Sequence, residues 1–256
     1  MMIDWTKLTD DPVDNNVRSK VLQYLKSIRQ ELPFNNYDLY LAQEYKDKRV
    51  LDIGIVEHTR ERMHADSWKH KIALNNASYV LGLDINHELV NELKSDGLNV
   101  VCCDATSDNY LGEKFDIIHI GDVIEHVNSP VDLIKFAVKH LDENGKIIVR
   151  TPAAYHYNYV NLVKRQSTDL SNMEHMFYVL PIHMMEICRR SEIGLSSYLT
   201  LTRGGFTIRG VKKMLRALSQ FKFKHCFAEI HTPRKCIQQF MFMNCKLINK
   251  KRVYER

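Results

Sequence analysis

The sequence predicts an α/β fold in which helices cover both faces of a doubly wound, mostly parallel seven-stranded sheet. Short apolar runs rich in Val and Ile alternate with stretches whose apolar residues recur at helical spacing. This alternation is typical of a parallel sheet with helices on both faces. The 256 residues, 45% of them hydrophobic, are enough for one buried core of ordinary size.

The chain divides into three expected parts. Residues 1–47 form an N-terminal helical segment, with an amphipathic helix over 17–32. Residues 48–152 carry the alternating pattern, with strands expected at 49–53, 79–83, 99–103, 115–120 and 146–150 and helices at 67–75, 87–95 and 130–141. Residues 153–256 complete the sheet, with a Tyr- and Asn-rich loop after 152, a helix at 181–191, strands at 195–201 and 239–248, and a basic, largely helical insertion at 203–236 that includes a helix at 207–220.

Composition and charge narrow the function classes. No apolar run approaches the ~18 residues of a membrane span, and the acidic N-terminus does not resemble a signal peptide. The six cysteines form no C-x-x-C pair, which argues against a zinc site or a disulfide framework. We therefore expect a cytoplasmic protein without a membrane span.

The positive charge is concentrated in the C-terminal part of the chain. Residues 201–256 contain 14 lysines and arginines against two acids, whereas the whole chain has a net charge of +5. Such a region either binds anions or is a solvated basic face with a basic tail.

Polar and glycine residues follow four of the expected strands. In a doubly wound sheet a ligand lies beyond the carboxyl ends of the strands, where the strand order reverses. A glycine there lets the backbone approach the ligand, and an acid can accept hydrogen bonds from ribose hydroxyls. The candidate segments are Asp52-Ile53-Gly54-Ile55, Asp84-Ile85, Asp104-Ala105 and Gly121-Asp122.

Five segments, in order and at the usual spacing, resemble the successive motifs of class I S-adenosylmethionine methyltransferases: RVLDIGIVEHT, VLGLDIN, VCCDAT, FDIIHIGDVIEHV and LDENGKIIVRTP. The resemblance covers about residues 48–152 and implies that this part binds S-adenosylmethionine. By position it assigns the ribose to Asp84, the adenine amine to Asp104, and the methionine part to Asp52 with Gly54. The full set of cofactor residues that it implies is Asp52, Gly54, Ile55, Asp84, Ile85, Asp104, Ala105 and Gly121.

The first of these loops departs from the family pattern D-x-G-x-G-x-G. Val56 and His58 stand where the later glycines would fall, so we expect a reshaped turn with residues 68–70 closing over it. A nicotinamide-dependent dehydrogenase shares the fold and the acid after the second strand. It needs G-x-G-x-x-G, however, and one glycine does not supply the turn, the close approach and the helix packing that three provide.

The group Asp122-x-x-Glu125-His126 has two interpretations. On a helix opening at Asp122, these side chains share one face and can converge on a metal ion. The spacing resembles the E-x-x-E-H group of metal-dependent 2′-O-methyltransferases, whose further histidine would correspond to His175. Magnesium or another divalent cation would then bind the substrate oxygen. Alternatively, Glu125 orients the helix and His126 acts alone.

The resemblance leaves the methyl acceptor open. His126 and His175 are the candidate catalytic residues for a hydroxyl acceptor, as base or metal ligand. We expect a small anionic or sugar-containing acceptor, such as a surface-polysaccharide precursor, met by the basic C-terminal region. RNA is the second choice, and a silent S-adenosylmethionine-binding protein is a third. The aromatic segment from Tyr155 to Tyr159 is a candidate acceptor lining or an ordinary loop.

Overall fold

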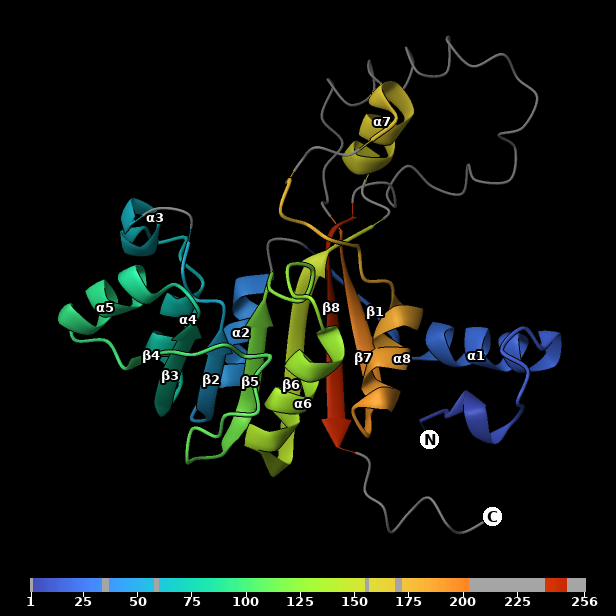
Figure 1. Ribbon diagram of the computed structural model, residues 1–256, viewed down its shortest axis with the longest axis horizontal. Helices are drawn as coiled ribbons and strands as arrows, with labels where there is room; N and C mark the ends of the chain where they lie inside the picture. Colours follow the sequence, from blue (N-terminus) through green and yellow to red (C-terminus); the bar gives the residue numbers. More distant parts are fainter. Residues whose placement is uncertain are drawn as a thin grey trace.

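A computed structural model describes residues 2–33, 37–57, 60–154, 157–168, 172–202 and 238–247. The described strands form one eight-stranded sheet in the order β1-β7-β8-β6-β5-β2-β3-β4 (Figure 1). Only β8 runs antiparallel to its neighbours. The strands are β1 (Arg29–Pro33), β2 (Arg49–Ile53), β3 (Tyr79–Asp84), β4 (Val100–Cys102), β5 (Phe115–Gly121), β6 (Leu141–Pro152), β7 (Ile193–Thr202) and β8 (Gln238–Leu247).

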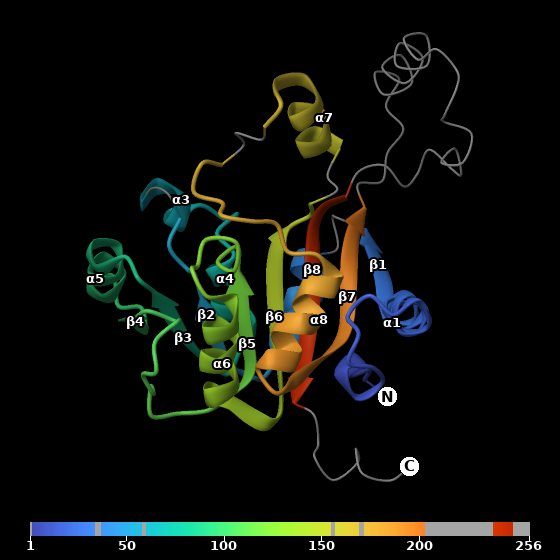
Figure 2. The same cartoon turned by 45° about the vertical axis from the view of Figure 1, so that its right-hand side comes forward.

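Helices cover both faces of this sheet, as Figure 2 shows from a second direction. They are η1 (Trp5–Lys7), α1 (Asn15–Ser27), α2 (Tyr37–Tyr45), α3 (Arg60–His64), α4 (His70–Asn76), α5 (His87–Ser95), α6 (Pro130–His140), α7 (Tyr157–Gln166) and α8 (Pro181–Arg190). None of the helices in the described part of the chain is long and apolar enough to cross a membrane.

The predicted fold class is confirmed, and the seven expected strands are all present. The expected N-terminal helix is wrong at its end, because α1 stops at Ser27 and residues 29–33 form the additional strand β1. This strand pairs in parallel with β7, Arg29 lying opposite Tyr198. Pro33 suits an edge strand, and a residue before proline disfavours a helix.

Two apolar clusters fix the layers on either side of the sheet. On one face, Tyr37, Leu41 and Tyr45 of α2 project at helical spacing and pack with residues of α4 and the central strands. On the other face, α6 and α8 pack on the central strands in the main core, joined there by Val17 and Val21 of α1.

The sequence pattern did not predict α2, and it placed residues 157–160 in a loop, whereas α7 begins at residue 157. The basic insertion at 203–236 lies outside the described residues.

The strand order reverses beside β2, which lies between β3 and β5. In the parallel register, Ile53 lies opposite both Leu83 and Ile120, so these three strands end at nearly the same level. The loops that follow them therefore share one edge of the sheet. In Figure 1 this edge is at the top, below α7.

Replacing Leu41 with Ala should destabilise the fold because Leu41 is fully buried between α2 and the sheet. A buried Leu→Ala change costs about 2–5 kcal/mol of unfolding free energy. Leu39→Ala, on the same helix but 63% exposed, is the matched control and should cost little. Urea unfolding of both variants measures the difference, and equal losses would contradict this packing of α2.

Candidate functional site

A cavity of about 770 Å³ opens at the carboxyl edge of the sheet. Its walls come from the loops after β2, β3, β4 and β5, from the end of β6, and from residues around His175. Six of the predicted cofactor residues line it: Gly54, Asp84, Ile85, Asp104, Ala105 and Gly121. The strand order thus places segments from four parts of the sequence around one space.

Gly54 makes the first turn possible. It has a φ of +82°, a conformation that favours glycine. A Cβ at this position would lie 2.2 Å from Cγ2 of Val123 and 3.1 Å from the carbonyl oxygen of Gly121. The loops after β2 and β5 therefore touch only because residue 54 has no side chain.

Two carboxylates stand at the ends of neighbouring strands. Asp84 accepts hydrogen bonds from the backbone N–H groups of Val56 at 2.9 Å and Asn86 at 3.0 Å. Asp104 accepts from the backbone N–H and the hydroxyl of Thr106, at 2.8 Å and 2.7 Å. Between them, Ile85 exposes 69% of its surface at the cavity. These contacts fix the positions of both acids and leave an apolar side chain beside them.

Asp52 and Ile55 do not line the cavity, and this corrects their expected place in the cofactor site. Asp52 is only 3% exposed, and its two carboxylate oxygens lie 2.7 Å from Nδ1 of His70 and Nδ1 of His119. Burial alone would raise the pKa of Asp52, but the charges and hydrogen bonds of His119 and His70 hold it well below its usual range. Ile55 packs in an apolar cluster with Met63 and Trp68.

The residues after β5 form a turn, not the helix that was expected to open at Asp122, and α6 begins only at Pro130. Asp122 has a φ of +52°, and its N–H donates to the carbonyl of Arg150 at 3.0 Å. The Arg150 guanidinium forms an ion pair with the Asp122 carboxylate, in which Nε donates to Oδ1 at 3.1 Å. Asp122 lines the cavity, and its carboxylate is already paired with the Arg150 guanidinium.

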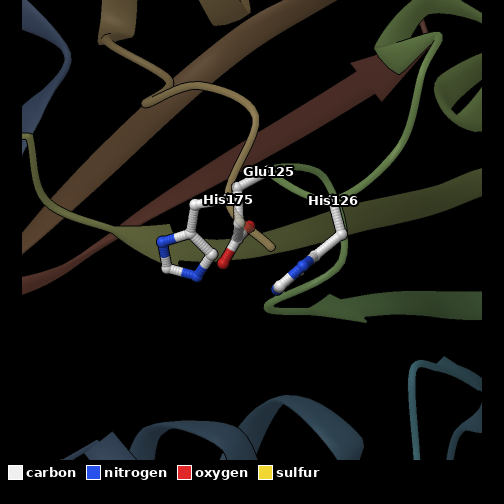
Figure 3. Close-up of side chains that lie close together, drawn as sticks. All are labelled: Glu125, His126 and His175. Carbon is white, nitrogen blue, oxygen red and sulfur yellow. The ribbon is translucent and has the colours of Figure 1, made fainter. Parts of the chain in front are cut away.

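Glu125, His126 and His175 converge at one wall of the cavity (Figure 3). One potential ligand atom from each lies within 4.8 Å of the others. The N–H of Met176 donates to the carbonyl of Glu125 at 3.0 Å, which fastens the segment of His175 to the turn. The two imidazole rings meet edge to face, with centroids 4.8 Å apart. The structure thus brings three of the four predicted metal residues together and leaves Asp122 outside the group.

The Glu125 side chain is fully buried, and only one of its two carboxyl oxygens has a hydrogen-bond partner among the described residues. Oε2 accepts from the hydroxyl of Thr151 at 3.0 Å, whereas Oε1 has no hydrogen-bond partner among them. Burial, and next the nearby charge of Asp122, raise the pKa of Glu125 to about 8. A buried carboxyl with a raised pKa in a cavity is typical of a functional group.

Arg150 and Thr151, which follow each other at the end of β6, were not among the predicted site residues. The segment IIVRTP could have indicated them, because a charged residue and a hydroxyl residue follow three apolar residues there. Those three residues are buried, so Arg150 and Thr151 stand at the carboxyl end of a buried strand, where ligands bind. Glu57 and Asn172 also line the cavity without having been predicted, whereas Tyr159 belongs to the expected aromatic lining. His58, Tyr155 and His156 lie outside the described residues.

The fold and this cavity define a class I S-adenosylmethionine-dependent methyltransferase. A family described as methyltransferase domain matches residues 25–190, which is more than half of the chain, and the chain belongs to this family. A comparison with curated proteins finds no match.

Solved structures of similar fold come from several organisms. The YcgJ protein of Bacillus subtilis is 16% identical with a TM-score of 0.53, and the match covers 84% of this chain and 99% of that chain. An S-adenosylmethionine-dependent methyltransferase of Archaeoglobus fulgidus is 13% identical with a TM-score of 0.51, over 83% and 96% of the two chains. Another from Clostridium acetobutylicum is 12% identical with a TM-score of 0.50, over 91% and 98%.

Replacing Asp52 with Asn should destabilise the protein most near neutral pH. A depressed carboxyl pKa adds stability that is fully present above the unfolded pKa of about 3.9 and is lost as the pH falls from there through the lower pKa of the folded protein. We expect a loss of about 3 kcal/mol at pH 7, because two buried histidines lose their anionic partner. Urea unfolding at pH 7 and at about pH 2 measures this, because most of the contribution is still present just below the unfolded pKa. Asp38→Asn, at an exposed ion pair, is the control, and a loss independent of pH would contradict the assigned charge.

Proposed function

We propose that the cavity binds S-adenosylmethionine and that the enzyme methylates an oxygen of a small anionic or sugar-containing acceptor, such as a surface-polysaccharide precursor. The observation that carries the cofactor assignment is the pair of carboxylates, Asp84 and Asp104, which follow adjacent strands and line the cavity together with Ile85. An acid after the second core strand suits ribose hydroxyls. Asp104 would then meet the adenine amine, and Ile85 the apolar face of the base.

The chain's own residues align the reactants and handle one proton. Bound S-adenosylmethionine supplies a methyl group on a sulfonium, so the leaving group needs no help from the protein. The Gly54 turn lets the backbone approach this end of the cofactor, and the cavity walls orient the acceptor. His126 or His175 takes the proton of the acceptor hydroxyl on an imidazole nitrogen.

The charge of the cavity wall limits how an anionic acceptor can be held. Arg150 is the one lysine or arginine among the described lining residues, and Asp122 already pairs with it. Six acidic side chains share this wall: Glu57, Asp84, Asp104, Asp122, Glu125 and Glu174. Because its pKa is raised to about 8, Glu125 is mostly neutral near pH 7, and the negative charge comes from the other five. An anionic group would be repelled here, so its recognition falls to the basic region 201–256, which contains 14 lysines and arginines.

Calorimetry with S-adenosylhomocysteine tests the cofactor assignment. Asp84→Asn should weaken binding about tenfold to a hundredfold, because charge-assisted hydrogen bonds to the ribose are lost. Asp66→Asn, at a fully exposed carboxylate, is the control and should bind like the wild type. A protein that binds NADH but neither S-adenosylmethionine nor S-adenosylhomocysteine would overturn the methyltransferase assignment.

A second candidate is metal-dependent 2′-O-methylation of RNA, which the convergence of Glu125, His126 and His175 favours. The group fits a cation because Oε1 of Glu125 is buried and lacks a partner among the described residues. One carboxylate and two imidazoles suit a transition-metal ion such as Mn²⁺ better than Mg²⁺, which prefers oxygen ligands. Such an ion would polarise the acceptor oxygen.

Titration with Mn²⁺, followed by calorimetry, tests the metal site directly. The wild type should bind one ion, and His175→Ala should abolish this binding because a ligand is removed. His87→Ala, at an exposed histidine on α5, should leave it intact. Wild-type protein that binds no ion, with activity unchanged by a chelator, would assign Glu125 and the histidines to proton transfer and orientation instead.

A further inference from the structure

The first loop lacks the later glycines of the family pattern, and contacts with β3, Trp68 and Asp84 hold it in place. After Gly54 comes Ile55, which is 3% exposed, and then Val56, which lines the cavity. The N–H of Gly54 donates to the carbonyl of Leu83 at 2.9 Å and ties the start of the loop to β3. The remaining polar contacts of the loop are concentrated on one peptide group.

This peptide group joins Ile55 to Val56 and is held at both ends. Its carbonyl accepts a hydrogen bond from Nε1 of Trp68 at 2.7 Å. Its N–H donates to Oδ2 of Asp84 at 2.9 Å. Because a trans peptide is planar, with its C=O and N–H pointing in opposite directions, the two contacts together fix the plane of the group. A continuous line of hydrogen bonds therefore runs from the Trp68 indole to the Asp84 carboxylate.

Trp68 is well placed to act at a distance from the ligand. It is 4% exposed, does not line the cavity, and packs with Ile55 and Met63 in an apolar cluster behind the loop. The Trp68 ring also contacts the imidazole ring of His70. His70 in turn is hydrogen-bonded to Asp52 near the end of β2. The indole is thus anchored to the same part of the chain that carries the loop.

We infer that Trp68 is a positioning residue for cofactor binding, which acts on Asp84 through the Ile55–Val56 peptide. This inference rests on the proposed function, in which Asp84 receives the ribose. Glycines would let the peptide rotate freely, whereas here the indole N–H holds it in one orientation. The Val56 N–H and the Asn86 N–H each occupy one oxygen of Asp84. Among the described residues these two bonds leave lone pairs on both oxygens that can accept from the ribose hydroxyls.

The two tryptophans of the chain allow a matched test with S-adenosylhomocysteine. Trp68→Phe keeps an aromatic ring and removes the N–H, so the loop should spend less time in the binding orientation and affinity should fall about fivefold to twentyfold. Trp5→Phe removes a similar indole bond, to Glu186 at 3.1 Å, far from the cavity wall, and affinity should not change. Equal affinities of the wild type and Trp68→Phe overturn the inference and leave the proposed function standing.

A double-mutant cycle separates positioning from general stability. If Trp68 acts through Asp84, Trp68→Phe should have little further effect on affinity in an Asp84→Asn background. Full additivity of the two losses overturns the inference. Wild-type protein that binds no adenosyl ligand overturns the proposed function, and the inference with it.

A measurement on folded protein covers the case in which Trp68→Phe does not fold. In Trp5→Phe, Trp68 is the single indole, and nuclear magnetic resonance follows its N–H exchange with solvent. Exchange should slow when S-adenosylhomocysteine binds, because the ligand stabilises the bonded orientation. Exchange that is unchanged on saturation with the ligand overturns the inference.

Discussion

The carboxylate of Asp52 is buried at the centre of the sheet, where an unpaired charge would cost several kcal/mol. It is stable there because His119 of β5 and His70 at the start of α4 each present a ring nitrogen at 2.7 Å. Asp52 and His119 are direct neighbours in the parallel register. This interaction therefore joins β2, β5 and α4, and the ends of the two strands form the floor of the cavity. An acid expected to bind the cofactor instead joins the elements whose loops line the cavity.

A second polar contact extends from the α2 face of the sheet into the cavity. The hydroxyl of Tyr37 lies 3.5 Å from Nε2 of His119, and the Arg150 guanidinium lies 5.8 Å from the centre of the Tyr37 ring. Arg150 then pairs with Asp122 at the cavity wall. The long arginine side chain thus connects buried polar groups under α2 with the site above the strand ends, so α2, which contributes no lining residue, still supports the site.

The sequence predicted the seven main strands because each is a short apolar run, and the five runs between residues 49 and 150 contain Val or Ile. The order of the motifs located Asp84, Asp104 and Gly54 at the cavity. It could not predict which face of β2 carries Asp52, because that depends on the two histidine partners and not on local pattern. The strand β1 was missed because its pairing with β7 is made by residues about 170 positions away. Spacing also predicted a helix at Asp122, where the ion pair with Arg150 accompanies a turn instead.

The two candidate reactions, methylation with and without a metal ion, differ in whether a proton or a cation is bound at the buried carboxyl of Glu125. With its pKa raised to about 8, Glu125 holds a proton near neutral pH, and the Thr151 hydroxyl bonds its other oxygen. In this state the carboxyl is neutral, and in the proposed O-methylation proton transfer would fall to His126 or His175. A cation would take the place of that proton, because metal ligands must be deprotonated and a nearby positive charge favours the carboxylate. The same three side chains can therefore serve either reaction, and the choice depends on whether a cation outcompetes one proton at Glu125.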